Sequence, residues 1–178
     1  MDLGITELKE RLLMIEEEAK LTFSEDSEFS CYIVGGGALI LMGYIVRSTH
    51  DIDAISAYPD EIREVYEHYD MNTDCMVFIS NFAEGYKDRA IRILPETTMV
   101  KFYVLSLEDI VISKLCSNGS DDRQKDIIDI NSEKVINDLD WDRLAELAEI
   151  VESQQFSNIA REDFLWNYKD YVRRNKDA

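Results

Sequence analysis

Two aspartates one residue apart are the residues of this sequence best suited to chemistry. Asp51 and Asp53 lie in the segment "HDIDAIS", which is typical of a β-strand, and alternate residues of a strand point to the same face. Two ionised carboxylates held in this way repel each other unless they share a cation. Mg²⁺ is usually bound by one or two carboxylates together with substrate phosphates, so the pair predicts a Mg²⁺ (or Mn²⁺) site.

Three glycines upstream of the aspartates predict the other half of such a site. Gly35, Gly36 and Gly37 follow the short apolar segment "CYIV", which is typical of a buried strand. Glycines there let the backbone approach a ligand, and a helix that begins directly after them would point N–H groups at a phosphate. Arg47 and Thr49, between the glycines and the aspartates, add two further donors. The combination indicates metal-assisted phosphoryl or nucleotidyl transfer.

Two other phosphate-binding motifs fit the sequence less well. A P-loop needs Gly-Lys-Ser/Thr after its glycines, and "GGGALI" lacks this sequence. A dinucleotide-binding fold is closer, because Gly35 and Gly37 form GxG and an acid follows. However, the third glycine position is Ile40, and the polar segment "VRSTH" stands where that fold needs a buried strand. Asp-x-Asp alone is common on protein surfaces, so the prediction rests on the combination of motifs.

The composition is that of an acidic globular protein. The 178 residues are 46% hydrophobic and carry a formal net charge of −18, which is unfavourable for broad binding to DNA. No apolar stretch approaches the roughly 20 residues of a membrane helix, and the N-terminal segment is charged, so we expect no membrane association and a cytoplasmic location. The three cysteines form no CxxC pair and indicate neither a zinc site nor a disulfide framework.

The hydrophobic pattern predicts a small mixed-sheet α/β (α+β) core with a C-terminal helical extension. We expect the core and an N-terminal helix in residues 1–105, and the extension, packed on the core as one compact unit, in residues 106–178. Strands are expected at residues 31–34, 50–56, 75–80, 89–94 and 100–106. Helices are expected at residues 6–21, 38–46, 60–69, 107–117, 121–137, 141–153 and 161–175, the fourth starting at Ser106.

The motifs resemble those of a known superfamily. "GGGALILMG" followed by "RSTHDIDAI" is similar to the nucleotidyltransferases of the DNA polymerase beta type, in which a Gly-Gly turn and a helix lead to a strand with Asp-x-Asp. With the later segment "LSLEDIVISKLCSNGSDDRQKDIIDI", the chain most resembles the bacterial AbiEii-like toxin nucleotidyltransferases and their uncharacterised relatives. The resemblance covers about residues 31–130.

The resemblance implies roles for individual residues. It makes the three glycines the phosphate turn and makes Asp51 and Asp53 the catalytic metal ligands. It makes Lys114 a catalytic or triphosphate contact, and Asp126 a catalytic acid on a second helix that orients Lys114 or the nucleophile. The third strand carboxylate of many polymerase-beta-type enzymes has no counterpart in "RAIRIL" or "VKFYVLS".

The expected function is Mg²⁺-dependent transfer of a nucleoside monophosphate from an NTP to a hydroxyl group. The acceptor stays open between RNA, such as a tRNA end, a protein side chain and a small molecule. The resemblance to toxins implies an antitoxin partner. Because the third carboxylate is missing, the alternative is a catalytically inactive protein of the same fold that binds a nucleotide or a partner.

Overall fold

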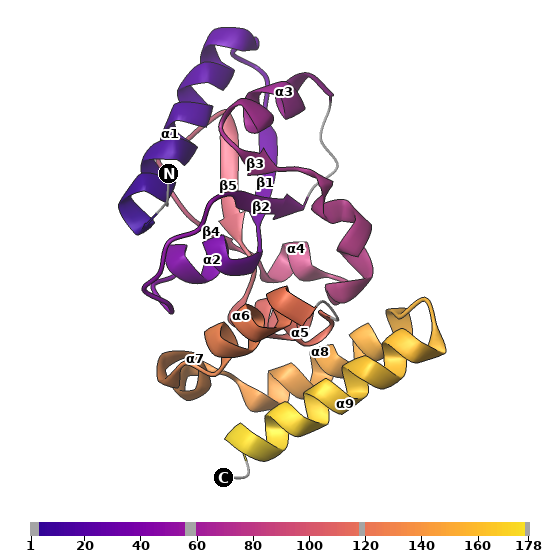
Figure 1. The fold of residues 1–178 in the computed structure, drawn as a ribbon. Helices are drawn as coiled ribbons and strands as arrows, with labels where there is room; N and C mark the ends of the chain where they lie inside the picture. Colours follow the sequence, from indigo (N-terminus) through magenta and orange to yellow (C-terminus); the bar gives the residue numbers. More distant parts are fainter. Residues whose placement is uncertain (1–3, 56–59, 118–119, 177–178) are drawn as a thin grey trace. The chain divides into compact units, whose positions relative to one another are not determined.

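The computed structural model describes residues 4–55, 60–117 and 120–176 (Figure 1). In this part of the chain, strands and helices alternate first and helices alone follow, which confirms the predicted mixed α/β fold class. The strands are β1 (Phe29–Ile33), β2 (Ile52–Ile55), β3 (Met71–Asn72), β4 (Ile91–Arg92) and β5 (Val100–Val104). The helices are α1 (Ile5–Thr22), α2 (Gly35–Leu41), α3 (Asp60–His68), the 3-10 helix η1 (Asp74–Asn81), α4 (Tyr86–Arg89), α5 (Leu107–Leu115), α6 (Ser120–Ile130), α7 (Glu133–Asp138), α8 (Trp141–Gln154) and α9 (Asn158–Asn175).

The chain divides into two compact units. Unit 1 consists of the described residues of Met1–Val77 together with Arg89–Leu105, and it contains the whole sheet. Unit 2 consists of Phe78–Asp88 together with the described residues of Ser106–Ala178, and it contains α5 to α9. None of the described helices is both long and apolar enough to cross a membrane.

The five-stranded sheet of unit 1 has the order β3-β2-β1-β5-β4. β1 pairs with β5 in parallel and with β2 in antiparallel orientation, while β3 runs parallel to β2 and β4 antiparallel to β5. One face of the sheet is apolar and buried, and α1, which also packs against α2 and α3, contacts β5. The buried side chains on this face of the sheet are Cys31, Ile33, Ile52, Ala54, Met71, Val100, Phe102 and Val104.

The opposite face of the sheet carries the polar and aromatic side chains. Tyr32 and Tyr103 lie side by side on β1 and β5, with ring centroids 5.0 Å apart and an interplanar angle of 16°. Asp53 and Asn72 are partners on β2 and β3. Side chains alternate between the faces of a strand, so the register places all four on one face. This face positions the candidate site.

A buried carboxylate connects α1 to the segment that leads into β5. Glu16 is only 2% exposed and accepts hydrogen bonds from the backbone N–H groups of Thr98, Met99 and Val100 at 2.7 to 3.1 Å. Burial alone would raise the pKa of Glu16, but these hydrogen bonds, with a further one from Lys20, lower it to about 2. Glu16 is therefore ionised over the whole neutral range and fixes this backbone segment.

Three helices of unit 2, α5, α8 and α9, lie where the sequence predicts helices. α5 starts where the sequence indicates, because the Ser106 hydroxyl accepts the Asp109 backbone N–H at 3.2 Å. α5 packs against α6, α8 and α9. The Tyr171 hydroxyl of α9 donates a 2.7 Å hydrogen bond to the Ile130 carbonyl at the end of α6. α8 and α9 confirm the helices expected at residues 141–153 and 161–175.

Residues 75–80 were expected to form a strand, and this prediction is wrong. They belong to the 3-10 helix η1, in which Cys75 is buried while Val77 and Phe78 are exposed. A short apolar run has no periodicity that separates a strand from a helix, and here most of its side chains stay outside the core.

Two helix predictions are wrong in their bounds. The helix expected at residues 38–46 starts at Gly35 and ends at Leu41, because Gly43 adopts φ +75° and the Tyr44 N–H donates back to the Leu39 carbonyl at 2.8 Å. The helix expected at residues 121–137 is divided into α6 and α7. The Ser132 hydroxyl caps the second of these helices.

Candidate functional site

The three glycines form the first turn of α2, so the expectation of a helix beginning after them is wrong. Gly35 adopts φ +65°, and a β-carbon there would lie 2.8 Å from Asp53 Oδ2. Both the conformation and the close approach require glycine. The turn and the Asp53 carboxylate, which the sequence separates, therefore lie close together.

The second glycine lies under the guanidinium group of Arg47. A β-carbon at Gly36 would lie 2.5 Å from Arg47 Nη2, at the end of a flexible side chain. Arg47 is exposed, and its Nη1 donates to the Ser48 carbonyl at 3.1 Å. A β-carbon at Gly37 would meet only Ile33 Cγ2 at 3.9 Å, which is ordinary contact. Gly35 and Gly36 therefore have close neighbours in the site, whereas Gly37 does not need to be glycine.

The two aspartates differ in their setting. β2 begins at Ile52, so Asp53 lies on the strand and is half-buried, while Asp51 is exposed in the bend before it. The expectation that both aspartates lie on the strand is wrong for Asp51. Thr49 donates its hydroxyl to the Asp51 carbonyl at 3.2 Å. The Val34 N–H donates to the Asp53 carbonyl at 2.9 Å, which ties β2 to the start of α2.

Two side chains that sequence reasoning missed hold the Asp53 carboxylate. Asn72 Nδ2 donates to Asp53 Oδ1 at 2.9 Å, and the Cys75 thiol donates to the same oxygen at 3.4 Å. Burial raises the pKa of the Cys75 thiol to about 12, and the charge of Asp53, the hydrogen bond to it and the charge of Asp51 add to this rise. Both carboxylates therefore contribute to one region of negative potential.

The donor set fits a hard divalent cation that completes its shell with other oxygens. Asp51 and Asp53 supply carboxylate oxygens, and Asp53 Oδ2 faces the glycine turn where phosphates are expected. Within residues 4–55, 60–117 and 120–176, no group of three or more His, Cys, Asp or Glu side chains is arranged to hold a metal. A Mg²⁺ ion here would thus depend on two aspartates, water and ligand phosphates.

Lys114 and Asp126, the other predicted site residues, come together in unit 2. The Lys114 ammonium contacts Asp126 Oδ1 and lies 3.2 Å from Asp129 Oδ2. Asp126 and Asp129 share one face of α6 because they are three residues apart. Lys114 is 8% exposed and Asp129 3%, whereas the Asp126 side chain is 20% exposed. The lysine is therefore neutralised within its own unit, and Asp126 is the member of the cluster that solvent reaches.

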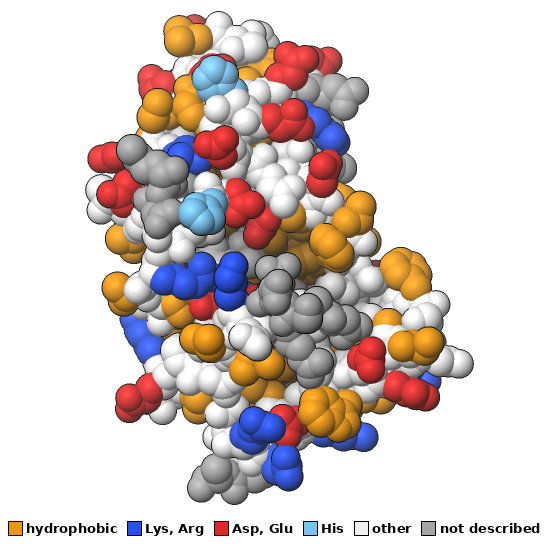
Figure 2. All heavy atoms as spheres, in the orientation of Figure 1, with side chains coloured by type: hydrophobic (Ala, Val, Ile, Leu, Met, Phe, Trp, Pro, Cys, Tyr) orange, Lys and Arg blue, Asp and Glu red, His pale blue; other side chains and the backbone are white. Residues whose placement is uncertain are grey.

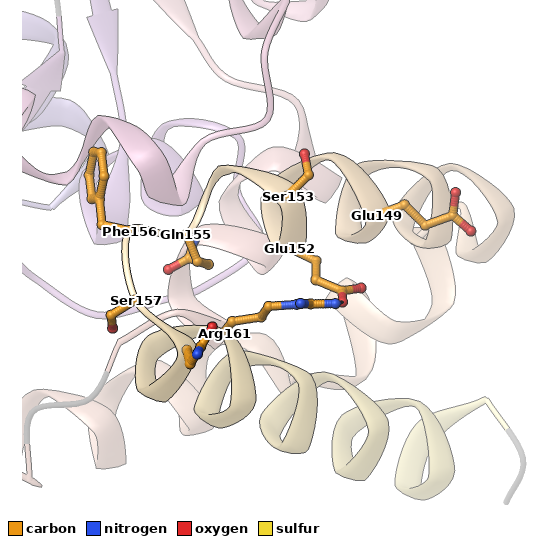
Figure 3. A pocket seen from close by; sticks show the side chains of 8 residues that line it. Glu149, Glu152, Ser153, Gln155, Phe156, Ser157 and Arg161 are labelled. Atoms are coloured by element: carbon orange, nitrogen blue, oxygen red, sulfur yellow. Dashed lines mark hydrogen bonds and ion pairs between the residues drawn. The ribbon is translucent and has the colours of Figure 1, made fainter.

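A hollow of about 650 Å³ lies at the turn between α8 and α9 (Figure 3). Its Arg161 side chain extends toward Glu152, to which Nε donates at 2.8 Å, while Phe156 points away from this pair. None of the predicted site residues lines the hollow.

A family model described as a nucleotidyltransferase of unknown function (DUF6036) matches residues 10–176 of the chain. The chain belongs to this family. The DUF6036 match spans both structural units and includes the glycine turn, both aspartates, Lys114 and Asp126. It confirms the predicted nucleotidyltransferase superfamily and implies an NTP substrate. No curated protein and no solved structure matches the chain.

Proposed function

We propose that this member of DUF6036 is a Mg²⁺-dependent nucleotidyltransferase that transfers a nucleoside monophosphate from an NTP to a hydroxyl group and releases pyrophosphate. The observation that carries the proposal is the contact between Gly35 and Asp53, which joins a glycine turn to a carboxylate. Such a turn suits phosphates, and such a carboxylate suits a metal bound to them.

Residues of unit 1 would bind the triphosphate. Asp51 and Asp53 would hold Mg²⁺, and a bound ion would neutralise the negative charge of the phosphates during transfer. The guanidinium of Arg47, which lies over Gly36, would donate to the phosphate oxygens. Thr49 supports the site through the Asp51 backbone, to which its hydroxyl donates.

Lys114 would be a catalytic or triphosphate contact, and Asp126 would orient this lysine or the nucleophile. We propose, from the resemblance to AbiEii-like toxins, that Lys114 and Asp126 take part in the reaction. The buried ion pair between them supports this, because it holds Asp126 in one orientation while leaving it partly exposed. A carboxylate in this setting can accept the proton of an attacking hydroxyl.

The candidate acceptors are RNA, protein side chains and small molecules. The resemblance to toxins favours an RNA acceptor, an antitoxin partner and a cytoplasmic location. The net charge of −18 opposes nonspecific attraction to RNA, and Figure 2 shows acidic side chains spread over the surface of α1 and α3. Protein and small-molecule hydroxyls therefore belong in the same test as tRNA.

A second candidate function is nucleotide binding without turnover. The third strand carboxylate has no counterpart in "RAIRIL" or "VKFYVLS", and the residue paired with Asp53 in the sheet is Asn72, an amide. Stabilisation of the protein by ATP and Mg²⁺, without any transfer, would favour this candidate. A ligand at 100 times its dissociation constant adds about 2.7 kcal/mol to the free energy of unfolding.

The proposal is tested with NTPs labelled at either the α- or the γ-phosphate, incubated with Mg²⁺ and with RNA, protein and small hydroxyl acceptors. Nucleotidyl transfer moves the α-label to the acceptor and releases the γ-label in pyrophosphate. Transfer of the γ-label instead would indicate a kinase. If no acceptor takes up the α-label from any of the NTPs, the proposal is contradicted.

A further inference from the structure

We propose that Asn72 is a positioning residue that fixes the Asp53 carboxylate for metal binding. This inference rests on the proposed function, because it takes Asp53 as a metal ligand. The Asn72 amide donates to Asp53 Oδ1 at 2.9 Å. The other oxygen, Oδ2, lies against the backbone of Gly35. One oxygen thus takes the side-chain donors, and the other is presented to the turn that would hold the phosphates.

A backbone group fixes which end of the amide faces Asp53. The Asp74 N–H donates to Asn72 Oδ1 at 3.1 Å. A backbone N–H can pair only with the oxygen of a side-chain amide, so the nitrogen has to point the other way. Asn72 therefore acts as a donor to Asp53, and the start of η1 sets this orientation.

The fold places Asn72 by means of a strand only two residues long. In β3, Asn72 is the direct partner of Asp53 on β2. Its neighbour Met71 is buried on the other face of the sheet, where the Cys31 thiol contacts its sulfur at 3.6 Å. Asp70, with φ +56°, turns the chain from α3 into this strand. This short strand positions one buried anchor and one amide.

The thiol of Cys75 reinforces the same arrangement. It donates to Asp53 Oδ1 at 3.4 Å, the oxygen that Asn72 also contacts. Two donors on one oxygen restrain rotation of the carboxylate. Groups that orient a metal ligand in this way typically contribute roughly 10- to 100-fold to metal affinity.

The test measures binding of Mn²⁺ alone by the loss of the free-ion signal in electron paramagnetic resonance, with thermal unfolding as the check on folding. We expect the wild-type chain to bind Mn²⁺ and Asp53→Asn to lose this binding. Asn72→Ala is expected to weaken Mn²⁺ binding roughly 10- to 100-fold. Asn158→Ala, an exposed asparagine of α9, is the matched control and should bind as the wild type does.

A second pair of variants tests the orientation of the amide without removing it. Asp74→Pro deletes the N–H that fixes the Asn72 amide, at the first residue of η1 where proline is tolerated. Asp74→Ala keeps that N–H and should bind Mn²⁺ more tightly than Asp74→Pro. If Asn72→Ala and Asp74→Pro, both folded, bind Mn²⁺ as tightly as the wild type, the role of Asn72 is wrong while the proposed function stands. A wild-type chain that binds no Mn²⁺ overturns both.

Discussion

The Lys114 ammonium lies 3.2 Å from Asp129 Oδ2, and both side chains are buried in unit 2. With Asp126 as a second acidic partner, one cation is shared by two carboxylates. Sequence reasoning paired Lys114 with Asp126 alone. The buried partner, Asp129, makes the lysine a structural element of α5 and α6 as well as a candidate for catalysis.

Lys114→Met should destabilise the protein strongly. The substitution leaves two carboxylates near one another without their cation, and breaking a buried ion pair in this way costs about 3 to 5 kcal/mol. Urea unfolding followed by circular dichroism measures this loss. Lys169→Met, at an exposed lysine of α9, should change the free energy of unfolding by less than about 0.5 kcal/mol. Equal stability of the two variants would show that the Lys114 cluster contributes little.

Gly35→Ala and Gly37→Ala form a matched pair. At Gly35, alanine must adopt φ +65° and place its β-carbon 2.8 Å from Asp53 Oδ2, which we expect to cost about 1 to 3 kcal/mol and to displace the carboxylate. At Gly37 the β-carbon has only ordinary contact, so alanine should be neutral or stabilising by about 0.5 to 1 kcal/mol. Chemical denaturation compares them. If both variants unfold alike, the close approach of Gly35 to Asp53 is wrong.

Acid stability should depend on Glu16. Its pKa is lowered from 4.5 to about 2 in the folded chain, so its ionised form stabilises the fold above pH 4.5, and this contribution disappears as the pH falls toward 2. Linkage gives about 3 kcal/mol. Glu16→Gln should lower stability at pH 7 by an amount of this order and flatten the decline between pH 4.5 and 2. Urea titrations at several pH values test this, and an unchanged decline in the variant would contradict it.

Alkylation of Cys75 should report the charge of Asp53. Burial, the Asp53 charge and the hydrogen bond to Asp53 raise the pKa of the thiol to about 12, so iodoacetamide should react slowly with the native protein at pH 8. Asp53→Asn removes the charge and should speed the reaction. Cys116, whose pKa is raised to about 12 by burial alone, serves as the internal control in the same sample. Mass spectrometry of the labelled peptides measures the alkylation rate of each cysteine. An equal increase in both rates in Asp53→Asn would contradict the account.

The sequence predicts the parts of the site that carry recognisable chemistry. Paired aspartates, a glycine run and a capped helix such as α5 each follow from local rules that need no tertiary information. The partnership of Lys114 with Asp126 came from family resemblance, since neither periodicity nor spacing brings α5 and α6 together.

The missed residues depend on contacts between distant segments. Asn72 lies on a strand of two residues, too short for any alternation, and its role depends on pairing with β2. Met76, Val77 and Phe78 of η1 are apolar but exposed, so their pattern favours the wrong element. Phe78–Asp88 belongs with unit 2 although it precedes β4 in the chain. Composition carries no signal for this assignment.

The most direct test of the central claim is the rate of α-label transfer from NTP in the wild-type chain, Asp51→Asn and Asp53→Asn. Asp26→Asn, an exposed acid of unit 1, is the control, and circular dichroism confirms that each variant is folded. We predict Mg²⁺-dependent transfer by the wild type and the control, and a loss of about a hundredfold or more in both site variants, because each removes a charge that holds the metal. Transfer at the wild-type rate by folded Asp51→Asn and Asp53→Asn would contradict the account.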